Sequence, residues 1–266
     1  MGYICEKVNE YTYHIDGLGR ESMYLIIGEE KALMIDTGME KDSLSDYVKT
    51  LTDKPVAVAL THGHFDHIGR CGDFEEVYID EKDIDMYIEH SNIKGWGIDV
   101  NTLNILDVNK AKPLPQSFDL GGVVIDVVPL AGHTTGSVLF VDRAAQLVYS
   151  GDAIGSGCGV LMLIKGALTI SEYRDALLQA DKDLKELGVD SSWQFYGGHN
   201  GQQHVSRVSE FNRLDLTLLE DMAVLCEKLL DGSAQTEEMK MPMGDMKALY
   251  AVYGKAEMNL SKQSIR

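Results

Sequence analysis

The sequence is poor in basic residues. Its 266 residues include 24 lysines and arginines against 42 aspartates and glutamates, which gives a formal net charge of -18 at pH 7. Proteins that bind nucleic acid or anionic membranes need a basic surface, because contacts with phosphate supply much of the affinity. The composition therefore argues against both partners and favours a small molecule as the ligand.

Cysteine and long apolar runs are also scarce. The four cysteines, Cys5, Cys71, Cys158 and Cys226, form no CxxC pair, so we expect free thiols in a reducing compartment. No apolar run approaches the ~18 residues of a membrane helix. The N-terminal MGYICEKVNE is charged early and lacks the apolar core of a signal peptide. These absences predict a cytoplasmic protein that lies off the membrane, and they leave a homodimer open.

The chain has enough apolar residues to bury a full core. Hydrophobic residues make up 44% of the sequence, which supports one domain over residues 1–266, with a helix and tail at 206–266. The strand-like segments are 3–15, 22–28, 32–36, 55–60, 76–79, 118–130 with a Gly121-Gly122 turn, 137–142, 146–149 and 192–196. The helix-like segments are 40–52, 68–74, 81–90, 171–187 and 206–230. Such alternation predicts an α/β fold, with Ser171 as an N-cap, Gly188 as a helix stop, an irregular stretch at 91–116 and an edge strand or helix at 248–253.

The stretch THGHFDHIG at 61–69 is the most informative part of the chain. It follows PVAVAL, an apolar segment of the kind buried on both faces of a sheet. Within six residues it carries His62, His64, Asp66 and His67. In extended backbone His62 and His64 point the same way and can reach one metal, and after the turn Asp66 and His67 can face a second. Imidazole with carboxylate suits Zn²⁺, with Fe or Mn as substitutes.

Three further candidate ligands follow apolar, strand-like segments and lie next to glycine. They are His133 in LAGHTTGS, Asp152 in YSGDAIGSG and His199 in FYGGHNG. In open α/β sheets, ligands bind at the carboxyl ends of the strands. We therefore expect these side chains to meet the motif at 61–69 and to complete a metal site.

The ordered set of seven side chains resembles the pattern of the metallo-β-lactamase superfamily, which is HxHxDH, a distant His, a bridging Asp and a final His. The resemblance implies a four-layer αβ/βα sandwich with the site between its halves. It implies two Zn²⁺ ions: one held by His62, His64 and His133, a second held by Asp66, His67 and His199, with Asp152 bridging both. It further implies attack by a metal-bridged hydroxide, with Asp66 or Asp152 orienting the water.

The sequence differs from several subfamilies of this superfamily, which reduces the number of subfamilies that it resembles. The second set contains no cysteine, unlike one class of β-lactamases, and His64 stands where flavodiiron oxygen reductases carry Glu. No long insertion resembles the extra domain of the RNA-processing nucleases. Asp36, in an Asp-Thr-Gly turn, has two interpretations: a carboxylate that supports a ligand histidine, or a turn residue that caps the following helix.

Substrate contacts are expected from loops around the site. One is 92–107 with Trp96, and the other is 155–169, whose apolar residues favour an apolar leaving group or a lid, or else packing on the sandwich or on a dimer partner. Lys165 could hold a substrate carboxylate or be solvated, and Phe65 could line the pocket or anchor its loop. Cys158 is expected to be structural. The weaker candidates for a proton donor are Tyr24, Tyr196 and His204.

The leading hypothesis is a dinuclear-metal hydrolase of a small carbonyl substrate: a lactone, thioester, β-lactam or other ester. The alternatives are a phosphodiesterase or nuclease, which needs a basic groove, and a non-catalytic metal-binding partner protein, against which the complete ligand set argues. Glyoxalase II-like members would need basic residues for glutathione, and a β-lactamase would favour export. Elimination therefore favours a lactone or a thioester.

Overall fold

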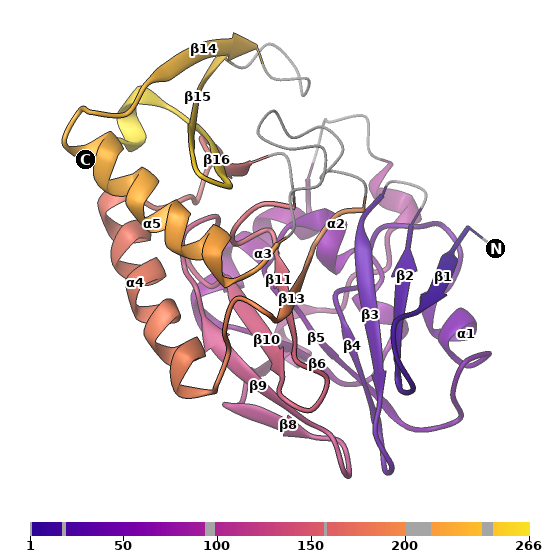
Figure 1. The fold of residues 1–266 in the computed structure, drawn as a ribbon. Helices are drawn as coiled ribbons and strands as arrows, with labels where there is room; N and C mark the ends of the chain where they lie inside the picture. Colours follow the sequence, from indigo (N-terminus) through magenta and orange to yellow (C-terminus); the bar gives the residue numbers. More distant parts are fainter. Residues whose placement is uncertain (1, 18–19, 94–98, 157–158, 201–213, 241–246) are drawn as a thin grey trace.

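The computed structural model describes residues 2–17, 20–93, 99–156, 159–200, 214–240 and 247–266 (Figure 1). A seven-stranded sheet contains, in spatial order, β1 (Ile4–Lys7), β2 (Thr12–Asp16), β3 (Ser22–Ile27), β4 (Ala32–Ile35), β5 (Val56–Ala59), β6 (Val77–Ile79) and β7 (Lys112–Pro113). A five-stranded sheet contains β13 (Gln194–Gly197), β11 (Leu147–Gly151), β10 (Val138–Asp142), β9 (Val124–Pro129) and β8 (Ser117–Asp119). A four-stranded sheet contains β12 (Val160–Met162), β16 (Ala256–Leu260), β15 (Lys247–Tyr253) and β14 (Thr236–Lys240).

Five α-helices accompany these sheets in the described ranges. They are α1 (Leu44–Val48), α2 (Phe65–Ile68), α3 (Ile84–Ser91), α4 (Ile170–Glu186) and α5 (Leu216–Leu230). Single 3-10 turns lie at Cys71–Asp73, Glu81–Asp83, Val100–Thr102, Val108–Lys110 and Lys262–Ser264. Strands β4 to β7 run parallel to one another, and β11 runs parallel to β13, so their carboxyl ends gather at one edge.

The inner strands of the seven-stranded sheet are buried on both faces. In β3, Leu25 packs on the outer side of the sheet and Ile26 on the inner side. In β4, Met34 and Leu33 divide in the same way, because successive side chains of a strand point to opposite faces. This arrangement explains why these segments are continuous apolar runs rather than alternating ones.

The two larger sheets pack face to face. Tyr24 and Ile35 from one sheet join Phe140 and Tyr149 from the other in a shared core, where the rings of Tyr24 and Tyr149 lie 4.8 Å apart. Buried residues of α1 and α3 cover the outer face of the first sheet, and those of α4 and α5 cover the second. The predicted four-layer αβ/βα sandwich is therefore confirmed.

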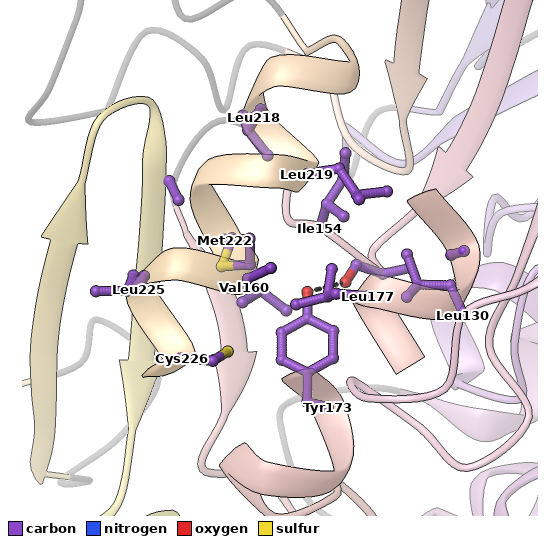
Figure 2. Packing of buried hydrophobic residues seen from close by; sticks show 14 of the residues in the cluster. Leu130, Ile154, Val160, Tyr173, Leu177, Leu218, Leu219, Met222, Leu225 and Cys226 are labelled. Carbon is purple, nitrogen blue, oxygen red and sulfur yellow. Dashed lines mark hydrogen bonds between the residues drawn. The ribbon is translucent and has the colours of Figure 1, made fainter. Parts of the chain in front are cut away.

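Helices α4 and α5 lie side by side along one flank of the molecule (Figure 1). Tyr173 and Leu177 of α4 point toward Val160 of β12 and toward Met222 of α5 (Figure 2). The hydroxyl of Tyr173 donates to the carbonyl oxygen of Ala153 at 2.6 Å. Because Ala153 follows Asp152, this packing also fixes a loop that carries a candidate ligand.

The N-cap of helix α4 lies two residues earlier than predicted. Thr169, rather than Ser171, is the N-cap: its hydroxyl accepts from the Glu172 backbone N–H, and the Glu172 carboxylate accepts from the Thr169 N–H. This reciprocal capping box satisfies two backbone donors that a helix start leaves free. Gly188, with φ at 88°, ends the helix as predicted.

Several predicted elements have different bounds. The strand expected at 3–15 is a hairpin of β1 and β2, because the Asn9 side chain accepts from the Tyr11 and Thr12 N–H groups and turns the chain. The helix expected at 40–52 is confined to α1, capped by Ser43. The predicted Gly121-Gly122 hairpin is confirmed, with both glycines at positive φ.

The C-terminal segment differs most from expectation. The stretch 155–169, expected as a loop, contains β12, which pairs in parallel with β16. The C-terminal tail, for which the sequence predicted only an edge strand or helix at 248–253, forms strands β14, β15 and β16. The last predicted helix begins at Leu216, where the Asp215 side chain caps it; residues 206–213 of that prediction lie outside the described residues.

Candidate metal centre

The candidate ligands lie at the edge where the strands of both sheets end. His62, His64, Asp66 and His67 occupy the turn after β5 and the short helix α2. His133 lies between β9 and β10, Asp152 follows β11, and His199 follows β13. The fold thus brings together all seven side chains that the sequence predicted.

One group consists of three imidazoles. Nε2 of His62 and Nε2 of His133 each lie 3.0 Å from Nδ1 of His64. All three side chains are buried, and the His64 ring stands nearly perpendicular to the other two, at 84° and 89°. Three nitrogens that converge in this way leave room for one cation between their lone pairs.

A second group combines two imidazoles with a carboxylate. His199 Nε2 lies 3.5 Å from Asp66 Oδ2, and the donor atoms of Asp66, His67 and His199 lie within 4.8 Å of one another. His67 Nε2 is buried and has no hydrogen-bond partner among the described residues. A buried nitrogen left in this state costs about 1–3 kcal/mol, and a bound cation would satisfy it.

Asp152 lies between the two groups. Its Oδ2 is 3.7 Å from His133 Nε2 in the first group, and 3.8 Å from His67 Nε2 and 3.4 Å from His199 Nε2 in the second. Gly198 allows this approach, since a Cβ at that position would lie 2.6 Å from Asp152 Oδ1. One carboxylate can therefore serve both groups.

Outer hydrogen bonds determine which imidazole nitrogen offers its lone pair. Asp36 Oδ2 lies 2.8 Å from His67 Nδ1 and accepts the Thr61 hydroxyl at 2.7 Å. The Thr61 hydroxyl can then accept from His62 Nδ1, at 3.0 Å. His133 Nδ1 lies 3.1 Å from the Leu161 carbonyl oxygen. Since each Nδ1 faces an acceptor, Nε2 is left unprotonated in His62, His67 and His133 when the rings are neutral.

Asp36 therefore supports a ligand histidine, as one of its two interpretations predicts. The other interpretation is wrong, because Ser43 caps the helix that follows. Asp36 has φ at 57°, an uncommon conformation for a residue other than glycine. Its carboxylate also accepts from the Thr61 backbone N–H at 2.8 Å, so one side chain orders the start of the motif.

Burial and neighbouring charge set the protonation of the site in opposite directions. Burial, helped by the surrounding imidazoles, lowers the pKa of His62 and His64 well below the ordinary histidine value. Burial also lowers the pKa of His67, but the Asp36 and Asp66 carboxylates outweigh it and hold that pKa well above the usual value. Burial raises the pKa of Asp152, yet His199 and His67 outweigh it and the pKa stands well below the usual range. The negative charge that favours a proton on His67 equally favours a metal cation there.

Asp83 is a buried residue that sequence reasoning missed. Its carboxylate accepts from the Gly63 N–H at 2.6 Å, the Gly136 N–H at 2.8 Å and the Thr134 hydroxyl at 2.9 Å. It therefore joins the loop of His62 and His64 to the loop of His133. Glycine is needed at 63, because a Cβ there would lie 2.8 Å from the backbone nitrogen of Tyr87 in α3. In sequence Asp83 is one of several acidic residues, and no local signal separates it from a solvated face.

A cavity of about 490 Å³ opens beside both groups. Phe65, Leu161 and Ile164 form apolar parts of its wall, and His90 of α3 also lines it. The sequence gave no reason to select His90; its burial lowers its pKa below the usual histidine value.

The apolar residues of the stretch 155–169 divide between the sandwich core, as its packing interpretation expects, and the cavity wall. Val160 and Met162 pack in the core beneath α4 and α5, while Leu161 and Ile164 face the cavity. Lys165 forms an ion pair with Glu89 at 2.6 Å and is 81% exposed. Its cation therefore already has a partner at the cavity wall.

Of the remaining candidate site residues, some lie in the packing between the sheets and the others lie outside the described residues. Tyr24 donates to the Gly197 carbonyl oxygen at 2.6 Å, and Tyr196 packs near it at 5.6 Å between rings, so both belong to the inter-sheet packing near β13. Trp96, Cys158 and His204 lie outside the described residues. Within the described ranges, no helix combines the length and apolarity that crossing a bilayer requires.

An αβ/βα sandwich with paired histidine and carboxylate groups at its strand ends defines a class of metal-dependent hydrolases. A family model described as the metallo-beta-lactamase superfamily matches residues 16–209. The chain belongs to this superfamily and is a metal-dependent hydrolase. The predicted resemblance is thereby confirmed.

Named relatives are consistent with this assignment. A probable metallo-hydrolase of Streptococcus pyogenes is 29% identical over 209 residues, covering 74% of this chain and 84% of that protein. The acyl-coenzyme A thioesterase MBLAC2 of Gallus gallus is 25% identical over 163 residues, covering 52% of this chain and 59% of that protein. The crystal structure of TTHA1623 in a di-iron-bound form has a TM-score of 0.55 at 26% identity, covering 76% of this chain and 93% of that one.

Proposed function

We propose that this protein is a two-metal hydrolase of thioesters. The observation that carries the proposal is the pair of donor groups joined by Asp152, whose Oδ2 lies within 3.8 Å of imidazole nitrogens from both. His62, His64 and His133 would hold one ion, and Asp66, His67 and His199 would hold the other. Zinc suits this donor set, and iron or manganese could replace it; the di-iron form of TTHA1623 supports a pair of ions.

When bound, such ions supply a nucleophilic water at neutral pH and polarise the scissile carbonyl. The chain itself contributes position and protonation. Asp66 and Asp152 are the carboxylates that can orient the water, and Asp66 can receive its proton. The outer contacts from Asp36 and Leu161 hold the imidazoles in place, so that little reorganisation is needed during the reaction.

Two observations favour a thioester over the other carbonyl substrates. Phe65, Leu161 and Ile164 give the cavity an apolar wall, which suits an acyl chain and keeps bulk water from the reacting carbon. The relative MBLAC2 is an acyl-coenzyme A thioesterase. A lactone is the second candidate, because it offers the same reacting carbonyl.

A phosphodiester is disfavoured by charge. The net charge of -18 lowers the affinity of an extended nucleic-acid polyanion, and Lys165 at the cavity wall is already paired with Glu89. A small molecule is therefore the proposed partner, with no role for nucleic acid.

The test combines metal analysis with a substrate panel. Purified full-length protein should bind two metal ions per chain, and hydrolysis of an acyl thioester should exceed that of a lactone, a β-lactam and an aryl phosphodiester in kcat/KM. Removal of metal with a chelator should abolish turnover, and added Zn²⁺, Mn²⁺ or Fe²⁺ should restore it. Turnover of the phosphodiester alone would refute the proposal, and a single ion per chain at saturation would refute its two-metal form.

A further inference from the structure

His90 of α3 lies against the metal centre although it belongs to neither donor group. Its ring centroid is 4.6 Å from that of His64. It also stacks with Phe65, with the two ring centroids 5.7 Å apart and the planes inclined by only 16°. The ring therefore packs on two residues of the motif and also lines the cavity.

The backbone fixes the proton of His90. The Phe65 N–H donates to His90 Nδ1 at 3.1 Å. A backbone N–H can only donate, so Nδ1 must accept, and the single proton of the neutral ring lies on Nε2. No described residue accepts a hydrogen bond from that Nε2–H. The site thus contains an oriented N–H donor that the protein itself leaves unused in the described ranges.

We propose that His90 Nε2–H donates a hydrogen bond to the carbonyl oxygen of the bound substrate. This role rests on the proposed function. When water attacks the thioester, a C–O bond forms and the carbonyl oxygen gains negative charge. The C–S bond then breaks, and the leaving thiolate takes up the proton that the water gave up, so that a thiol is released. His90 keeps its proton throughout and acts by stabilising the oxygen. Oxygen, rather than the leaving sulfur, is the suitable partner, because sulfur accepts hydrogen bonds weakly.

The physical basis is preorganisation. A donor held at the cavity wall before the substrate binds needs little reorganisation during the reaction, and removing one donor to developing charge costs about 10²–10³-fold in kcat. The contacts with Phe65 and His64 restrict the ring, so the donor is fixed by the same loop that carries the metal ligands.

Two substitutions separate this role from simple packing. His90→Asn keeps an oxygen near the position of Nδ1 for the Phe65 N–H but has no donor at the position of Nε2. His90→Gln can place an amide N–H near that position. Asp85→Asn, at an exposed residue of the same helix, is the matched control.

The experiment measures steady-state hydrolysis of the acyl thioester, metal content, and affinity for a ketone analogue in which CH₂ replaces the sulfur. For His90→Asn we expect kcat to fall about 10²-fold, KM to change little, and metal content to match the wild type. Its affinity for the ketone should fall as well, and His90→Gln should recover much of both losses.

Wild-type kcat and ketone affinity in His90→Asn would overturn the inference and leave the proposed function intact. Equal losses in the Asn and Gln variants, accompanied by loss of metal, would assign His90 to packing alone. A wild-type enzyme that turns over no carbonyl substrate would instead refute the proposed function, and with it the role of His90.

Discussion

Replacing Asp83 by Asn tests how the two ligand loops are held together. Among the described residues, the partners of this carboxylate are all donors: the Gly63 and Gly136 N–H groups and the Thr134 hydroxyl, with the Thr135 hydroxyl more distant at 3.5 Å. An amide has one oxygen, so whichever way it turns, its NH₂ meets one of the two backbone N–H groups. One buried backbone donor is then left without an acceptor.

The expected magnitude follows from that single unpaired donor. A buried unsatisfied group costs about 1–3 kcal/mol. Burial raises the pKa of Asp83, which means that burying its charge is unfavourable, and asparagine removes part of this penalty. We therefore expect a net loss of about 2 kcal/mol in the free energy of unfolding. If the substitution disfavours the metal-binding position of the loops by the same free energy, metal affinity should fall by about 30-fold, since about 1.4 kcal/mol corresponds to a tenfold change in a binding constant. This loss lies within the range found when residues that hydrogen-bond to metal ligands are replaced.

The assay is urea unfolding of the metal-free protein, followed by competition for Zn²⁺ against a chromophoric chelator. Asp85→Asn, two positions further along and exposed, should match the wild type in both measurements. An unfolding midpoint and a zinc affinity for Asp83→Asn equal to those of the wild type would show that the two loops do not depend on this carboxylate, and the reasoning would fail.

Three further predictions concern the ligands and the core. His133→Ala should bind one metal ion per chain in place of two, and retention of two ions by mass spectrometry would contradict its assignment. Asp152→Ala should weaken both sites and lower kcat/KM by more than about 10²-fold, since the bridge is lost; two ions held at wild-type affinity would exclude bridging. Leu177→Ala removes a fully buried side chain between α4 and α5 and should cost about 2–5 kcal/mol. A change below about 1 kcal/mol in urea unfolding would mean that this core collapses around the gap.

Some of the fold is legible from local pattern. The apolar run before His62 predicted a strand buried on both faces, and β5 is such a strand. The α4 segment was also recognised, because its amphipathic period is strong and Gly188 marks its end. Its start was misplaced by two residues, since both Thr169 and Ser171 are good caps and only Thr169 has Glu172 three positions later to complete the box.

The C-terminal sheet could not be read in the same way. Val160–Met162 resembled an apolar loop, because a three-residue strand shows too few alternations to reveal a period. Its identity depends on pairing with Ala256–Leu260, far along the chain. The helix predicted at 40–52 is shorter in the structure. Ser43 caps it at its start, and past Val48 the Thr50 and Leu51 N–H groups donate three residues back, to Tyr47 and Val48.

The sequence by itself determined the donor set. The identity and order of the ligands can be read directly from the sequence. In extended backbone, residues i and i+2 point to the same side, so the spacing of His62 and His64 already predicts that they can share one metal. Tertiary structure alone decided how the donors are supported and what they face. Asp83, Asp36 and His90 act through contacts with residues 20 or more positions away, as in Gly63 to Asp83, Asp36 to His67 and Phe65 to His90. Such contacts depend on how the sheets and α3 pack against one another, so they cannot be predicted from the local sequence pattern.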